Sequence, residues 1–382
     1  MTIPGFIVRN ALRNKRRLIL TVLSVAVSLF LFTTLQTALH LMTHPPTTEE
    51  AALRIATRHR VSLANVLPSK YQFRIERMPG VKYCSKFTYF GGIYRDQSQS
   101  NFAQFAVDAD RIFRIFPEMI VSPREEEEFR KEKTACIVGA KLLERFGWKV
   151  GDKITFQGTI WGCDPELTIR GTYRGQGIDE TLVFFHHDYF DELTGDRGLV
   201  GAFWIKADSA EVVPGLIERI DAAFRNTDAE TKTETERAFQ LEFISMLGNV
   251  KLFIGSISTV IVFTMLLVTA STMSMAIRER SREMAILKAI GFNASEIAGL
   301  ILAESFGQAM TGGLLGCLGA KLLFAHLDIY KLSGGNIPMF PVTADVVALG
   351  LLVALGLGVA SSILPARSTI KATVVEGLKE LD

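Results

Sequence analysis

The sequence AIRERSREMAILKAIGFNASEIAG, at residues 276–299, decides how the rest of the chain is divided. It begins at the end of a stretch without charged side chains, 252–277, and opens with a cluster of charged residues: Arg278, Glu279, Arg280, Arg282 and Glu283. Apolar residues then recur at the spacing of one helix face: Met284, Leu287, Ile290, Ile297 and Leu300. The pattern predicts a membrane helix, a short amphipathic helix on an aqueous face, and a second membrane helix.

The end of this segment carries residues that turn the chain. Gly291 suits the C′ position of a helix, and Asn293 or Ser295 can cap the helix that follows. A short helix held in this place can dock its exposed side into a groove on a soluble partner. An ordinary cytoplasmic loop, held on the membrane surface by its arginines, would show the same periodicity, so the pattern alone leaves both interpretations open.

Four apolar segments are long enough to cross a hydrocarbon core of about 30 Å. They are residues 18–42, 250–277, 297–320 and 346–366. A secretory signal peptide is the alternative for the first segment, but a signal peptide has a shorter apolar core and a small-residue cleavage site. This apolar run is long and ends in Leu-Met-Thr-His-Pro-Pro, so we expect a retained membrane helix.

The basic residues lie at the ends of these segments in a pattern that predicts their orientation. Residues 1–17 carry five basic side chains and no acidic one, and further basic residues occur within 278–296 and 367–382. Basic residues concentrate on the cytoplasmic side of membrane proteins. We therefore expect both termini in the cytoplasm, with an amphipathic N-terminus and a C-terminal tail there, and residues 43–249 and 321–345 outside.

The long polar region 43–249 predicts a mixed α/β domain. Strand, helix and strand patterns occur in both of its flanks, about 54–121 and 199–240, and the first strand is predicted at 58–63. Two such flanks predict a split βαβ arrangement, and the part between them, about 122–198, predicts a β-rich insert. The predicted fold is a membrane protein of four transmembrane α-helices with a large extracytoplasmic α/β (α+β) domain between helices 1 and 2.

Composition and motifs exclude several classes of function. The net charge is +2, and the basic residues follow the membrane topology and do not form one patch, so nothing indicates a nucleic-acid partner. No Gly-x-x-x-x-Gly-Lys-Ser/Thr loop occurs, and we expect no cofactor and no catalytic residue in this chain. The adjacent His186 and His187 lack metal-ligand spacing and are expected to be surface residues, with no metal site. The cysteine count leaves open whether two of Cys84, Cys136 and Cys163 form a disulfide bond.

Two features of the third segment concern its place in the membrane. Glu304 is an acid in an apolar stretch, which is costly unless water, a partner or protonation satisfies it. A hinge or coupling contact and an interfacial carboxylate paired with Arg278 or Arg282 are equally good interpretations. Gly312 and Gly316 have the small-xxx-small spacing that lets helices approach closely, so we expect them to pack against a neighbouring helix.

Three parts of the chain resemble a known family. The run Arg-x-Arg-x-Arg-Glu-Met-x-x-Leu-x-Ala-Ile-Gly at 278–291, followed by Ile297, resembles the coupling-helix signature of the MacB/FtsX-like ABC transporter permeases. Residues 138–156 resemble the Gly-x-x-Leu-x-x-x-x-Gly-x-x-Val-Gly-Asp pattern of their external domain. Residues 365–380 resemble their C-terminal tail more loosely.

The resemblance implies a non-catalytic permease subunit that works with a separate ABC-type ATPase, which binds ATP and Mg. In the family the quoted segment contacts that ATPase, which implies a coupling set in this chain: Arg280, Arg282, Glu283, Met284, Leu287, Lys288 and Gly291. It further implies a homodimer or a pair with a similar permease, contact with membrane lipid, a periplasmic adaptor in exporters, and a location in the bacterial inner membrane.

A mechanotransmission mechanism also follows from this resemblance. ATPase closure moves the coupling helix, and the membrane helices carry the motion to the external domain, which exports or extrudes a substrate on the outer face. An FtsX-like signal transmitter, which activates an extracytoplasmic partner without moving a substrate, is the alternative. A membrane-tethered binding domain without an ATPase is weaker, because it leaves the coupling motif without a role. The size of the external domain favours the exporter, and lipid, lipoprotein, peptide and haem-like substrates all stay open.

Overall fold

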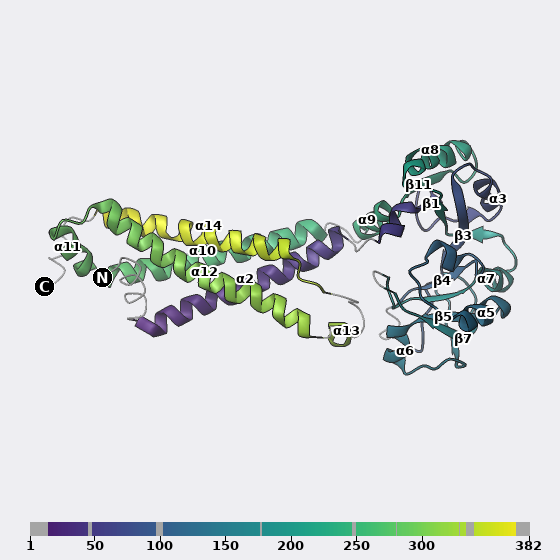
Figure 1. The fold of residues 1–382 in the computed structure, drawn as a ribbon, viewed down its shortest axis with the longest axis horizontal. Coiled ribbons are helices and arrows are strands. Elements are labelled where there is room, and N and C mark those ends of the chain that lie inside the picture. The colour runs from purple at the N-terminus through teal and green to yellow at the C-terminus, as the bar shows by residue number, and fades with distance from the viewer. Residues whose placement is uncertain are drawn as a thin grey trace. The chain divides into compact units, whose positions relative to one another are not determined.

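The computed structural model describes residues 14–44, 48–96, 102–175, 178–246, 250–279, 281–327, 329–333 and 340–371. They form two compact units (Figure 1). The helical unit comes from residues 1–43, 247–328 and 340–382, and the α/β unit comes from residues 44–246 and 329–339. A large α/β domain therefore separates the first membrane helix from the other three, and the predicted fold class is confirmed.

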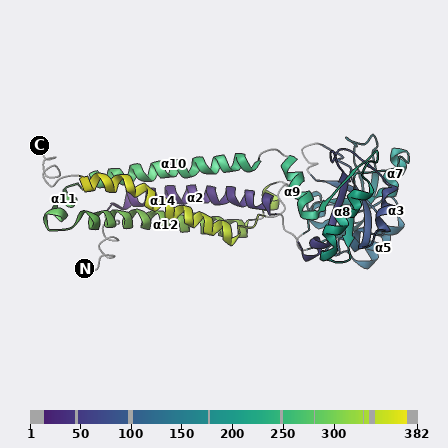
Figure 2. The same ribbon diagram turned by 90° about the horizontal axis from the view of Figure 1, so that it is seen from above.

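Four long helices of the helical unit run side by side (Figures 1 and 2). They are α2 (Lys15–Thr43), α10 (Val250–Arg278), α12 (Ala294–His326) and α14 (Ala344–Lys371). Each contains a stretch long and apolar enough to cross a membrane. Helical backbone satisfies its own polar groups, as hydrocarbon requires. Hydroxyl side chains of the spans do the same, since the Thr264 Oγ1–H donates to the Val260 carbonyl at 2.7 Å.

The helices extend beyond the apolar segments by which the sequence delimits them. α12 occupies Ala294–His326, whereas the sequence predicted 297–320. α14 continues to Lys371, into the segment expected to be a cytoplasmic tail. Polar residues can continue a helix wherever water replaces hydrocarbon, so hydropathy marks the span and not the helix ends. Most of the expected amphipathic N-terminus and the end of the tail lie outside the described residues.

Glycines bring α12 into close contact with its neighbours. A Cβ atom added at Gly312 would lie 2.7 Å from the Val25 Cγ1 atom of α2, and one added at Gly316 would collide with the Ala26 carbonyl oxygen. Gly313 meets α14 in the same way. No side chain fits at these positions without movement of the helices, so Gly312 and Gly316 lie at the contact between α2 and α12.

The α/β unit is built on one mixed sheet of nine strands, the first part of which has a split βαβ order. That part runs β11-β1-β10-β3 and is antiparallel throughout. Its strands are β1 (Arg54–His59), β3 (Val81–Tyr89), β10 (Ala202–Ala207) and β11 (Thr231–Thr235). Helices α3 (Tyr71–Glu76) and α8 (Val213–Ala223) pack apolar residues against one face of these strands.

The position of β1 differs from the strand predicted at 58–63. The strand begins and ends four residues earlier than predicted, because Arg54 has the sequence character of an exposed residue, yet Arg54 and Arg58 are each only 3% exposed. Both guanidinium groups are paired with carboxylates, at 2.6 Å for Arg54 and 3.1 Å for Arg58. The strand therefore begins at Arg54, and its alternate residues Ile55 and Thr57 face the apolar side.

Five further strands continue the same sheet from β3, in the order β4-β8-β5-β7-β6. They are β4 (Gln104–Val107), β5 (Ala135–Gly139), β6 (Lys153–Thr155), β7 (Glu166–Tyr173) and β8 (Val183–His186). β4 belongs to the range assigned to the first flank, and it joins the two parts by pairing antiparallel with β3 and parallel with β8. Four helices complete this part: α4 (Ile112–Ile115), α5 (Pro123–Lys131), α6 (Ala140–Phe146) and α7 (His187–Thr194).

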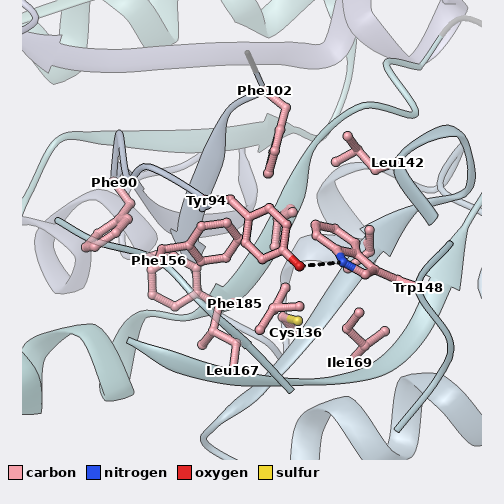
Figure 3. Packing of buried hydrophobic residues seen from close by; sticks show 14 of the residues in the cluster. Phe90, Tyr94, Phe102, Cys136, Leu142, Trp148, Phe156, Leu167, Ile169 and Phe185 are labelled. Atoms are coloured by element: carbon pink, nitrogen blue, oxygen red, sulfur yellow. Dashed lines mark hydrogen bonds between the residues drawn. The ribbon is translucent and has the colours of Figure 1, made fainter. Parts of the chain in front are cut away.

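An aromatic core fills this second part of the sheet (Figure 3). Its buried rings include Phe90, Tyr94, Phe102, Trp148 and Phe156. The Trp148 Nε1–H donates to the Tyr94 hydroxyl at 3.0 Å, which satisfies the one polar atom of a buried indole. α6 ends at Gly147 with a φ of +66°, a conformation that favours glycine, and β6 follows as residues 138–156 led us to expect.

The two adjacent histidines and three of the four cysteines are buried. His186 and His187 are buried, contrary to the surface position expected, because α7 begins there against the sheet. Burial lowers the pKa of His186, and its ring contacts the Phe129 carbonyl. No group of metal-ligating side chains occurs in the part of the chain that the structure describes. All four cysteines are free thiols.

Candidate coupling site

The segment that connects α10 to α12 contains a short helix, α11 (Ser281–Ala289), at the end of the helical unit (Figure 1). The sequence predicted a coupling segment at 278–296. In the structure α10 extends through Arg278 and α12 begins at Ala294, so the separate helix is limited to nine residues. Glu279 is held beside the first turn of α2 by an ion pair with Arg17, at 2.5 Å.

The turn after α11 is fixed by local chemistry. The Phe292 N–H donates to the Leu287 carbonyl at 3.0 Å, and the Gly291 N–H donates to the Lys288 carbonyl at 3.1 Å. These two hydrogen bonds make a Schellman motif, which requires the φ of +106° found at Gly291. The Asn293 N–H then donates to the Glu296 carboxylate at 2.9 Å, so Asn293 and not Ser295 caps α12.

The inner side of α11 is buried within the chain itself. Met284 is 9% exposed and packs in one apolar cluster with Met273 and Ala276 of α10 and with Ile297 and Ile301 of α12. Leu287 is partly buried against the same cluster. The side chains of Met284 and Leu287, two members of the implied coupling set, therefore tie α11 to both membrane helices, and their contact with an ATPase stays a prediction.

The outer side of α11 and of the turn presents a second apolar group, which stays exposed among the residues that the structure describes. Ile286, Ile290 and Phe292 are 45%, 72% and 43% exposed. Ile286 and Ile290 stand four residues apart and share one helix face. Sequence reasoning placed Ile290 on the same stripe as Met284, because periodicity identifies an apolar stripe without showing which of its residues the adjoining helices cover.

The charged members of the predicted coupling set have different surroundings. Glu283 and Lys288 are half buried, and both make polar contacts. Gly291 is exposed at the turn. Arg280 and the side chain of Arg282 lie outside the described residues. The structure thus places Ile286, Ile290, Gly291 and Phe292 together on the accessible side of the segment.

Glu304 lies on α12 and is 8% exposed. It stands ten residues after the first residue of the helix, which corresponds to about 15 Å along the helix axis at 1.5 Å per residue. The neighbouring Ser305 is 1% exposed. Glu304 therefore belongs to the packed interior of the helical unit and makes an interaction there, and it does not line the exposed side of α11.

Two family models match this chain. A MacB-like periplasmic core domain matches residues 18–223, and an FtsX-like permease C-terminal domain matches residues 255–374. An uncharacterized ABC transporter permease of Methanocaldococcus jannaschii is 24% identical over 257 residues, which are 65% of this chain and 63% of that protein. The chain thus spans less than two thirds of the length of the curated relative that it matches.

Two solved structures are also similar to the chain. The extracellular domain of the ABC-type transporter YknZ from Gram-positive bacteria matches with 12% identity and a TM-score of 0.37, covering 47% of this chain and 99% of that one. The periplasmic region of MacB from Actinobacillus actinomycetemcomitans matches with 8% identity and a TM-score of 0.38, covering 50% of this chain and 92% of that one.

The two family models between them include the α/β unit and the membrane helices. They confirm the resemblance seen in the sequence, and with the four apolar helices they make this a multi-pass membrane protein. The chain belongs to the MacB/FtsX-type family of ABC transporter permeases.

Proposed function

We propose that this chain is the membrane subunit of an ATP-driven exporter, and that α11 receives the motion of the separate ATPase subunit. The observation that carries the proposal is the two-sided character of α11. Ile286 on its outer side and Ile290 and Phe292 in the turn after it are exposed, and its inner side packs against both α10 and α12. Apolar anchors in a partner's groove supply most of the energy of such a contact.

The mechanism that we propose is mechanotransmission. The Met284 side chain packs against residues of α10 and α12 at once, so displacement of α11 would move both helices together. α10 leads back along the chain to the α/β unit, which would change shape and extrude a substrate on the outer face. ATP and Mg would be bound by the partner, which is consistent with the absence of a phosphate-binding loop from this sequence.

The proposed assembly has two permease chains, either identical or similar, with both termini in the cytoplasm of a bacterial cell and a periplasmic adaptor as a further partner. Orientation is tested by cysteine labelling from outside in a Cys163→Ser background. We expect Arg124→Cys, at a fully exposed position of α5, to be labelled and Ser295→Cys to stay unlabelled. The reverse result would overturn the orientation.

The coupling contact is tested with Ile290→Asp in nanodiscs, by co-purification with the candidate ABC-type ATPase that the wild-type chain binds and by stimulation of its ATPase activity. We expect both to be lost, because a carboxylate in an apolar groove is costly. Ile120→Asp is the matched control, since Ile120 is 70% exposed in the α/β unit and Ile290 is 72% exposed. Wild-type binding and stimulation by Ile290→Asp would rule out this surface as the contact.

Export and signalling are separated by one further measurement. A vesicle-reconstituted complex that moves a candidate lipid or peptide in an ATP-dependent manner supports the exporter. A complex that hydrolyses ATP, moves no such substrate and activates an external enzyme instead supports the signal transmitter.

A further inference from the structure

The helix that precedes α10 covers a second face of the split βαβ strands. This helix is α9 (Glu236–Met246), and the chain between it and α10 consists only of residues 247–249. α9 contacts β1 and β11, and its Phe239 ring packs edge-on against Trp204 of β10, with centroids 5.7 Å apart. α3 and α8 cover the opposite face, where Ile55 and Ile205 point.

Several ion pairs join α9 to these strands. Glu236 accepts from Arg54 Nε at 2.6 Å. Glu242 lies 2.5 Å from an Arg58 guanidinium nitrogen and accepts from Lys232 Nζ at 2.6 Å. Arg58 also donates to Glu234 of β11 at 3.1 Å. Among the side chains that the structure describes, Phe239 of α9 joins an apolar cluster around Trp204.

Two buried polar atoms lie where α9 packs on these strands. Within the described residues, neither the Trp204 indole N–H nor the Gln240 side-chain oxygen has a hydrogen-bond partner. A buried donor or acceptor without a partner loses its water contacts and gains nothing in exchange. Buried ion pairs likewise recover little beyond their own desolvation cost. These described polar contacts therefore supply little net free energy to hold α9 in its closed position.

We propose that α9 is a releasable cover: it detaches as a unit from the charged face of β11, β1 and β10, while these strands, α3 and α8 stay folded. The apolar residues that bind α3 and α8 do not depend on α9, because they lie on the other face of the sheet. The three-residue connection to α10 makes α9 the first element of the α/β unit that a displacement of α10 would pull. The inference goes beyond the proposed function and holds for the chain without an ATPase.

Hydrogen exchange of the full-length protein in nanodiscs tests this inference. Arg58→Met removes the cation that joins β1 to α9, and we expect amide exchange in α9 to become about tenfold faster, with exchange in β10 unchanged. Arg60→Met is the matched control, because Arg60 directly follows the same strand and pairs with Glu230, and not with a described residue of α9. It should alter neither segment. Glu242→Gln, which leaves the sheet intact, should repeat the effect of Arg58→Met.

Three results would overturn the inference. In the first, α9 of the wild-type protein exchanges only as slowly as β10, so that it opens only on global unfolding. In the second, both variants accelerate α9 and β10 together, which makes α9 an integral part of the domain. In the third, neither variant changes exchange in α9, so the ion pairs do not hold it.

Discussion

The two faces of the strands β11, β1 and β10 carry the same backbone and opposite chemistry. On one face, Ile55, Phe203 and Ile205 are fully buried under α3 and α8. On the other face, Arg54, Arg58 and Lys232 meet the carboxylates of α9 and its neighbours. Burial of apolar surface is favourable in itself, whereas burial of charge is favourable only as long as every partner stays in place. We therefore expect the cover of α3 and α8 to stay in place when that of α9 is released.

Phe203→Ala disrupts the apolar face under α3 and α8 and should have the largest effect on stability. Removal of a fully buried phenylalanine leaves a cavity and typically costs about 4 kcal/mol. Tryptophan fluorescence measures the result selectively, since all three tryptophans of the chain, Trp148, Trp161 and Trp204, lie in the α/β unit. An unchanged unfolding midpoint would mean that this face does not support the domain.

Arg54→Met disrupts the charged face and should lower the free energy of unfolding by about 3 kcal/mol, because Glu118 and Glu236 would stay buried without their cation. The triple variant Arg54→Met, Glu118→Gln, Glu236→Gln removes the unpaired charges as well. It should recover most of the lost stability in chemical denaturation. If the triple variant is as unstable as the single one, the loss comes from packing of the arginine and not from stranded charge.

Glu242→Gln should have a smaller effect, and that effect should depend on pH. Hydrogen bonds from Lys232 and then Arg58 lower the pKa of Glu242 from 4.5 to about 2. Because the folded pKa is the lower one, the stabilisation by Glu242 is present above pH 4.5 and is lost as the pH falls towards 2. The facing Glu234 behaves in the opposite way, since burial first and the Glu242 carboxyl second raise its pKa. The melting temperatures of wild type and Glu242→Gln should therefore converge as the pH is lowered from 4.5, and a constant difference would contradict this assignment.

Lys153→Ala should have the smallest effect. Lys153 pairs with Glu166 at 2.6 Å, a distance like those under α9, but both side chains are more than half exposed. Water and salt screen such a pair, so we expect no resolvable change in melting temperature. A loss of stability comparable to that of Arg54→Met would show that an exposed ion pair matters as much as the buried pairs of the charged face.

The sequence by itself determined the parts of this protein that depend on local chemistry and on hydropathy. Four apolar segments, the Gly291 turn and the split βαβ order were all predicted, because each follows from the composition of one segment or from a recurring pattern. The membrane imposes the four apolar segments most strongly, since a backbone whose polar groups lack hydrogen bonds cannot cross hydrocarbon.

Only the tertiary structure decided which residues of each segment are covered. Periodicity placed Met284 and Ile290 on one stripe, and the close approach of α10 and α12 buries the first and leaves the second exposed. Arg54 and Arg58 have the sequence character of surface residues, yet carboxylates from β11, α9 and Glu118 allow both to be buried inside a strand. Burial of a charge depends on partners that are distant in sequence, and their arrival is decided by the fold as a whole.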